Sequence, residues 1–159
     1  MKGHKIAKYT SIVLMIIILA IGFVLIKSTS PQRAAKKQAV KIAKDIGNIK
    51  QVDEFYWFTR DQSFFTIVGK DDKNQGKIVI IPEDGKEGIV YDTKDGVHYG
   101  EAVQAVLDSN ETTHIKNINL GMVDNKPVWE ISADGKNHEL NYYLVDFKTG
   151  KIIEKIIGV

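Results

Sequence analysis

The longest apolar run of the chain lies near its N-terminus. Residues 9–26 carry no charge, and residues 12–26 are apolar throughout except for Gly22. At a rise of roughly 1.5 Å per residue, this run forms a helix of about 27 Å, close to the thickness of a hydrocarbon core of about 30 Å. We therefore expect a transmembrane signal-anchor at residues 9–27, preceded by a cytoplasmic tail at residues 1–8.

The alternatives to an anchor are a cleaved signal peptide and a buried core helix. A signal peptide has a shorter apolar region and a cleavage site with small residues, and the one candidate site, residues 28–30, is followed directly by Pro31. A core helix of this length would normally carry a polar stripe, which this run lacks. Both alternatives fit the pattern less well than an anchor.

Lysines set the expected orientation of the anchor. Lys2, Lys5 and Lys8 precede the apolar run, and loops rich in Lys and Arg tend to stay in the cytoplasm. Basic residues also follow between positions 33 and 50, but this segment must cross with a whole domain, where local charge counts for less. We expect a single-pass protein of the cell membrane whose C-terminal part is extracellular.

Behind the anchor, the pattern predicts one helix and then a series of strands. Ser30 and Pro31 suit a helix start, and Gly47 suits its end. Ala35, Ala39, Ile42, Ala43 and Ile46 recur between them at helical spacing. Alternating runs bounded by turn residues then predict three or four antiparallel strands. These predicted strands are Val52–Thr59, Ser63–Gly69, Lys77–Pro82 and Gly88–Thr93.

The same plan recurs in the second half of the chain. A short helix is expected at Tyr99–Leu107, followed by strands at His114–Val123, Pro127–Ala133, Glu139–Phe147 and Lys151–Ile157. A single offset of 65 residues aligns the two halves without a gap. It places Phe64 on Trp129, Phe55 on Leu120, Ile42 on Leu107, Val79 on Leu144, Ile80 on Val145, and Gly85 and Lys86 on Gly150 and Lys151.

Charge and cysteine content exclude several classes of protein. Four of the 22 Lys and Arg residues lie at or before position 27, whereas all 20 Asp and Glu residues lie beyond it. The exterior part is therefore nearly neutral and does not suit nucleic acid. The chain has no cysteine, which excludes disulfides, a thiol nucleophile, a cysteine zinc site and an acylated cysteine.

Two segments of the second half carry a family resemblance. They are Lys126–Ile131, with Trp129 and Glu130, and Tyr142–Ile153, with Asp146 to Lys151. These segments resemble the C-terminal half of a PepSY-type domain. Over its whole length, the chain resembles the TseB/YpmB-like family of Gram-positive bacteria. The resemblance implies an α+β fold with two tandem cystatin-like or PepSY-like domains at residues 28–95 and 96–159, each a helix packed on an antiparallel sheet.

The resemblance also implies a function, which is non-enzymatic regulation of cell wall elongation and peptidoglycan synthesis through contact with a class B penicillin-binding protein. It supplies no catalytic residues. Its motif residues have a structural interpretation instead, as the buried face of a sheet and a strand-ending turn in which glycine takes a positive φ. The motif residues are Trp129, Glu130, Tyr143, Asp146, Thr149 and Gly150.

Residues that could carry chemistry do not form a known constellation. The four histidines, His4, His98, His114 and His138, have no metal-ligand spacing. The short acidic groups lack the ligand pattern of a calcium loop, and no nucleophile elbow or phosphate-binding loop is present. We expect no enzyme activity, no metal, no cofactor and no small-molecule substrate.

The predicted first sheet has more apolar residues than one buried face needs. The offset of 65 suggests that Phe55, Trp57, Phe64 and Ile80 face the first helix. The other face would then carry Tyr56, Phe58, Phe65, Ile67, Val79 and Ile81. We expect the second repeat or its linker to cover this face, because large exposed apolar patches are unusual.

The alternative is that this face docks a partner protein, with aromatic side chains as anchors. The candidate partner-binding residues are Tyr56, Phe58, Phe65 and Ile67.

Three functional hypotheses follow. The first is an interaction protein that binds another envelope protein, which accounts for the anchor, the repeat and the lack of visible chemistry. The second is a PepSY-type inhibitor of an extracellular protease, which would need an exposed wedge loop, whereas the turn at residues 71–76 is polar. The third is an envelope enzyme acting on peptidoglycan, which would need an acid, base or metal constellation.

Overall fold

The computed structural model describes residues 15, 17, 33–85, 87–136 and 139–158. The chain divides into two compact units, Met1–Lys37 and Gln38–Val159. The predicted tail and anchor lie outside the described residues, except for Met15 and Ile17, which are helical and exposed. Within the described ranges, no helix is both long enough and apolar enough to span a membrane.

The first half of the larger unit forms one antiparallel sheet. Residues 38–46 are helical, and the turn that ends this helix is closed by the Gly47 N–H, which donates to the Ala43 carbonyl at 2.9 Å. The predicted helix stop at Gly47 is therefore confirmed. The strands that follow are β1 (Gln51–Thr59), β2 (Ser63–Lys70), β3 (Gly76–Pro82) and β4 (Ile89–Asp92), which pair in sequence order.

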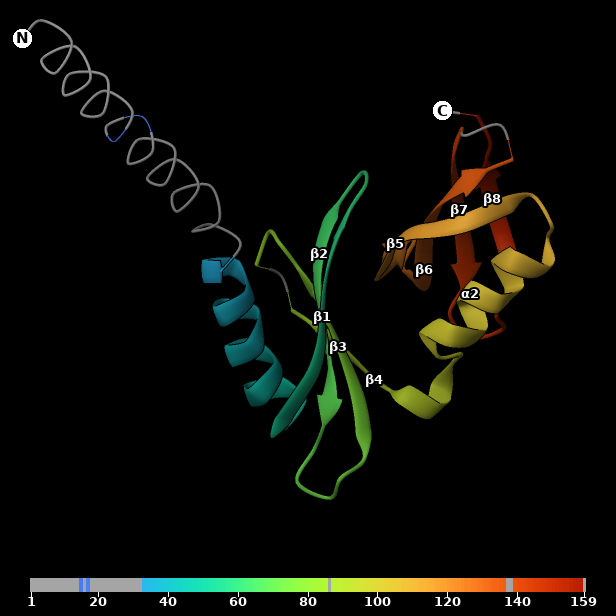
Figure 1. Ribbon diagram of the computed structural model, residues 1–159. Helices are drawn as coiled ribbons and strands as arrows, with labels where there is room; N and C mark the ends of the chain where they lie inside the picture. The colour runs from blue at the N-terminus through green and yellow to red at the C-terminus, as the bar shows by residue number, and fades with distance from the viewer. Residues whose placement is uncertain (1–14, 16, 18–32, 86, 137–138, 159) are drawn as a thin grey trace, which may run out of the picture. The chain divides into compact units, whose positions relative to one another are not determined.

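The second half repeats this plan. A short 3₁₀ turn, η1 (Thr93–Asp95), leads to the helix α2 (Tyr99–Asp108). The second antiparallel sheet, also in sequence order, contains β5 (Thr112–Val123), β6 (Lys126–Gly135), β7 (Leu140–Asp146) and β8 (Ile152–Ile156). Figure 1 shows α2 beside β5 and β6. The predicted α+β class with two similar halves is confirmed.

Two glycines show the repeat at atomic level. Gly85, in the turn between β3 and β4, has a φ of 81°, and Gly150, between β7 and β8, has a φ of 68°. This backbone conformation is costly for residues with a Cβ, which explains a glycine at both positions. The predicted offset of 65 residues therefore aligns two equivalent turns.

The faces of the first sheet differ from those expected. Strand register pairs Phe58 with Phe64, Tyr56 with Thr66, and Thr66 with Ile80. Directly paired residues share a face, so Phe64 and Ile80 lie on the side of Tyr56 and Phe58. Our placement of Phe64 and Ile80 with Phe55 and Trp57 was wrong.

The opposite face of this sheet carries Phe55, Trp57, Phe65, Ile67 and Val79, according to the same register. This face lies toward the helix, because a Cβ on Gly47 would come within 2.5 Å of Val79 Cγ2. The alternation of side chains within one strand shows only which residues of that strand share a face. The relative phase of two strands depends on their register, which the 65-residue offset does not supply.

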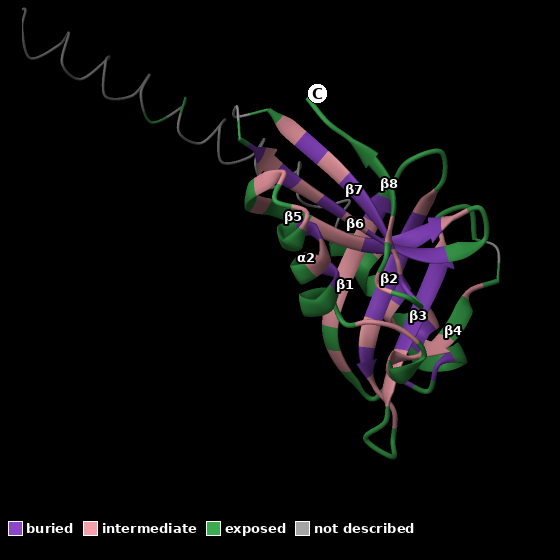
Figure 2. Cartoon of the chain, turned by 90° about the vertical axis from the view of Figure 1, so that its right-hand side faces the viewer, coloured by how far each residue is buried: buried purple, intermediate pink, exposed green. Residues whose placement is uncertain are grey.

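The two sheets share one hydrophobic core. Strand β5 is the edge of the second sheet and lies on the Tyr56 and Phe58 face of the first, where the Thr66 hydroxyl donates to the Leu120 carbonyl at 2.6 Å. One cluster of buried side chains includes Phe58 and Phe64 from the first repeat and Leu120 from the second. Figure 2 shows buried segments of β2 and β3 close to those of the second sheet.

A close approach at Gly121 holds the two repeats together. A Cβ built on Gly121 would overlap Phe58, whose own Cβ would be 2.6 Å away. Phe58 is fully buried. The absence of a side chain at position 121 therefore lets the Phe58 ring pack directly on the β5 backbone.

Candidate functional site

The motif residues Trp129 and Tyr143 form the buried face of the second sheet. Trp129 pairs with Val145 and Ile131 pairs with Tyr143, so these four side chains share a face, as predicted. The Trp129 indole donates from Nε1 to the Val97 carbonyl at 3.0 Å, just before α2. Its ring also meets Tyr56 edge-on, with centroids 5.5 Å apart.

The motif residues Asp146, Thr149 and Gly150 form the turn after β7. Asp146 Oδ1 accepts hydrogen bonds from the Thr149 N–H at 2.8 Å and the Thr149 hydroxyl at 2.7 Å. Burial would raise the pKa of Asp146, but these bonds and one from the Lys148 N–H outweigh burial and lower the pKa. The turn keeps a charged carboxylate as its anchor, which supports the structural interpretation of the motif.

The four candidate partner-binding residues do not form one exposed surface. Tyr56 and Phe58 lie on the face that packs on the second repeat, whereas Phe65 and Ile67 lie on the opposite face. Phe58 and Ile67 are fully buried, and Phe65 is 9% exposed. The surplus of apolar residues in the first sheet is thus explained by cover on both faces.

A pocket lies where the turn between β1 and β2 meets the second sheet. It has a volume of about 330 Å³ and is lined by Arg60 from this turn. The second sheet contributes Glu130, Leu144 and Glu154, together with Tyr142 and Ile156. Register places these five residues on one face, opposite to that of Trp129.

Arg60 links the two repeats across this pocket. Its Nη2 donates to Glu154 Oε1 at 3.0 Å, and its Nε lies 3.9 Å from Glu130 Oε2. Burial raises the pKa of Glu130, while the positive charge of Arg60 and a hydrogen bond from Asn119 act in the opposite direction. Glu130 is therefore a carboxylate whose ionisation depends on its cationic neighbour.

The structure reveals this cluster, and the sequence did not. Arg60 lies just after the predicted strand Val52–Thr59, and Glu154 lies 94 positions further along the chain. Glu130 was noted as a motif residue without a partner. The signal in the sequence is a charged residue, Glu130, between the apolar residues Trp129 and Ile131.

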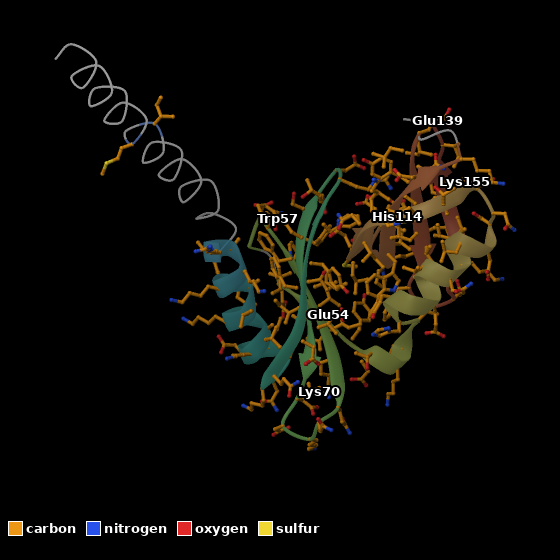
Figure 3. All side chains as sticks on the ribbon, viewed as in Figure 1. Glu54, Trp57, Lys70, His114, Glu139 and Lys155 are labelled. Atoms are coloured by element: carbon orange, nitrogen blue, oxygen red, sulfur yellow. The ribbon has the colours of Figure 1, made fainter. Side chains whose placement is uncertain are left out.

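Other polar groups in the described part support helix and strand ends. His98 Nδ1 accepts from the Gly100 N–H at 3.5 Å at the start of α2. Lys155, labelled in Figure 3, donates from Nζ to Glu111 Oε1 at 2.6 Å. Among the described residues, no group of three His, Asp or Glu side chains is arranged to hold a metal ion.

Comparison with known proteins points to one family. A family model described as "Cell wall elongation regulator TseB-like domain" matches residues 38–82. The "Probable cell wall elongation regulator TseB" of Bacillus subtilis (strain 168) is 25% identical over 146 residues, which cover 91% of each chain.

A solved structure also matches, "YpmB protein from Bacillus subtilis". It superposes with a TM-score of 0.69 at 25% identity, and the match covers 76% of this chain and 95% of that one. The sequence motifs, the two-sheet fold and these matches agree, and together they support a relationship of the chain to the TseB/YpmB-like family.

Proposed function

We propose that this protein is a non-enzymatic, membrane-anchored extracellular protein that regulates cell wall elongation by binding a class B penicillin-binding protein. The observation that carries the proposal is the likeness, over 91% of both chains, to a protein named as a probable cell wall elongation regulator. Such extensive coverage supports a shared role for the whole chain.

The arrangement of the two repeats supports a binding role. Their shared core fixes the second sheet relative to the first through Phe58, Thr66 and Trp129. A rigid surface of this kind suits protein recognition, because little conformational freedom is lost on binding. In the Arg60 pocket, Arg60 pairs with Glu130 and Glu154.

Tethering would add to the strength of such a contact. If residues 9–27 hold the protein in the membrane of its partner, the two proteins meet at a high effective concentration. A weak contact between the exterior domains would then suffice. The proposal therefore includes a functional role for the anchor.

Crosslinking in intact cells, followed by purification of this protein, tests the proposal. We expect a class B penicillin-binding protein to be recovered with the full chain. A secreted variant that lacks residues 1–27 should recover much less of it, although the exterior part still folds. Recovery of no cell-wall synthase with the full, folded chain would refute the proposal.

A further inference from the structure

The outer edge of β8 is open in the part of the chain that the structure describes. The second sheet has the order β5-β6-β7-β8, so β8 pairs only with β7. Ile153 is 54% exposed and Ile156 is 42% exposed. An open strand edge offers backbone N–H and C=O groups to an additional extended segment.

The Arg60 pocket adjoins this edge. Glu154 and Ile156 of β8 line the pocket, and their side chains lie on the same face as Glu130 and Leu144. Side chains alternate between the faces of a sheet, so every second residue of a strand added beside β8 would point to this face. Such a residue is placed to enter the pocket.

Charge selects the side chain that fits. The pocket contains one cation, Arg60, which feels the negative charges of Glu154, Glu130 and Asp61. The local excess of carboxylates favours a second cation. Leu144 and Tyr142 provide apolar surface that suits the methylene chain of a long basic residue.

We propose that β8 binds an extended segment of a partner protein, and that a lysine or arginine of this segment enters the pocket and pairs with Glu130 and Glu154. This inference rests on the proposed function and names the surface that it uses. The incoming cation shares the two carboxylates with Arg60. Binding therefore changes the ion pairs of Arg60, which join the turn after β1 to the second sheet.

A second copy of this chain fits the edge less well when it pairs about Ile153, Glu154 or Lys155, the three central residues of β8. Two antiparallel β8 strands related by a two-fold axis pair residues symmetrically about one central position. Centred on Glu154 or Lys155, the arrangement places two like charges opposite each other. Centred on Ile153, it places Lys151 opposite Lys155. Directly opposed like charges destabilise strand pairing.

Photo-crosslinking of the full chain in cells tests the inference. A photoreactive phenylalanine derivative replaces Ile156 in one variant and Leu107 in another, which is 37% exposed on α2. Mass spectrometry then identifies the attached segment. We expect the probe at position 156 to attach to a segment that contains a lysine or arginine.

Charge reversal supplies the second measurement. Glu154→Lys should reduce the adduct at position 156 by about tenfold, since it turns an attraction into a repulsion. Glu87→Lys makes the same charge change on an exposed residue of the first repeat and should leave the yield nearly unchanged. Glu154→Gln, which keeps the size of the side chain, should give an intermediate loss, and thermal unfolding confirms that each variant folds.

The outcomes separate this inference from the proposed function. Adducts at position 107 without adducts at 156 would overturn the β8 site and leave an interaction protein. If the segment attached at position 156 contains no lysine or arginine, or if Glu154→Lys leaves the adduct yield unchanged, the proposed basic side chain is wrong. Absence of adducts at both positions, while chemical crosslinking still recovers a cell-wall synthase, would overturn the site alone. If that recovery also fails, both proposals fall.

Discussion

Substitution of Gly121 by alanine tests the shared core of the two repeats. The new Cβ would overlap the Phe58 ring and lie 2.6 Å from the Phe58 Cβ. The Cβ atoms of residues 58 and 121 are bonded directly to the backbone, so β1 and β5 must move apart slightly to relieve the overlap. Overpacking of this kind costs about 1–3 kcal/mol, and we expect the upper half of that range.

A double-mutant cycle isolates the contact. Phe58→Ala alone should cost about 3–5 kcal/mol, because the ring is fully buried. In that background, Gly121→Ala no longer meets the ring but still meets the Cβ of residue 58, so its cost should fall by about 1–2 kcal/mol. The double mutant should therefore be more stable than the sum of the single mutants predicts, by about 1–2 kcal/mol.

Equilibrium unfolding in urea, followed by tryptophan fluorescence, measures these free energies. Leu107→Ala is a suitable control because this side chain is partly exposed on α2, and it should cost much less than Phe58→Ala. If the two substitutions at Gly121 and Phe58 add without coupling, the β5 backbone does not pack on the Phe58 ring and the description of the shared core is wrong.

Three further predictions concern single contacts. Thr66→Val keeps the shape of the side chain but removes its bond to the Leu120 carbonyl, so the free energy of unfolding should fall by about 1–3 kcal/mol in the same assay. Arg60→Gln removes the charge that lowers the pKa of Glu130, so an NMR titration of the Glu130 carboxyl should show a midpoint further above 4.5 than in the unmodified chain. Gly150→Ala places a Cβ at a φ of 68° and should lower stability by about 1–2 kcal/mol in thermal unfolding.

The raised pKa of Glu130 also fixes the sign of its effect on stability. A raised folded-state pKa favours the protonated side chain, so the contribution of Glu130 is present below pH 4.5 and is lost as the pH rises through the folded-state pKa. Arg60→Gln should extend this pH window upward.

An unchanged titration midpoint of Glu130 in Arg60→Gln would contradict the electrostatic link between these residues. Full stability of Thr66→Val would contradict the buried hydrogen bond between the repeats.

The strands of this fold could be predicted because local signals agree. Val52–Thr59 and Pro127–Ala133 alternate between two faces and end at turn residues, and both lie within observed strands. Gly85 and Gly150 mark equivalent turns because only a residue without a Cβ takes their conformation cheaply.

Register and long-range contacts could not be predicted in this way. Phe64 was assigned to the wrong face because the pairing of β1 with β2, rather than any local pattern, sets the phase between the two strands. The pocket of Arg60, Glu130 and Glu154 joins a turn of one repeat to two strands of the other. Apolar periodicity carries no information about such pairs, and the exposed turn at Arg60 looked ordinary in the sequence.

The covered edge of β5 has a consequence for each repeat taken alone. The Leu120 carbonyl on that edge is satisfied by Thr66 of the other repeat, and the Phe58 ring fills the space left by Gly121. A half that existed alone would present this edge and its apolar surroundings to water, where it would invite aggregation. Because the two repeats cover each other in this way, removal of either one would leave the other with an open strand edge and exposed apolar side chains. The two halves therefore depend on each other as one folding unit.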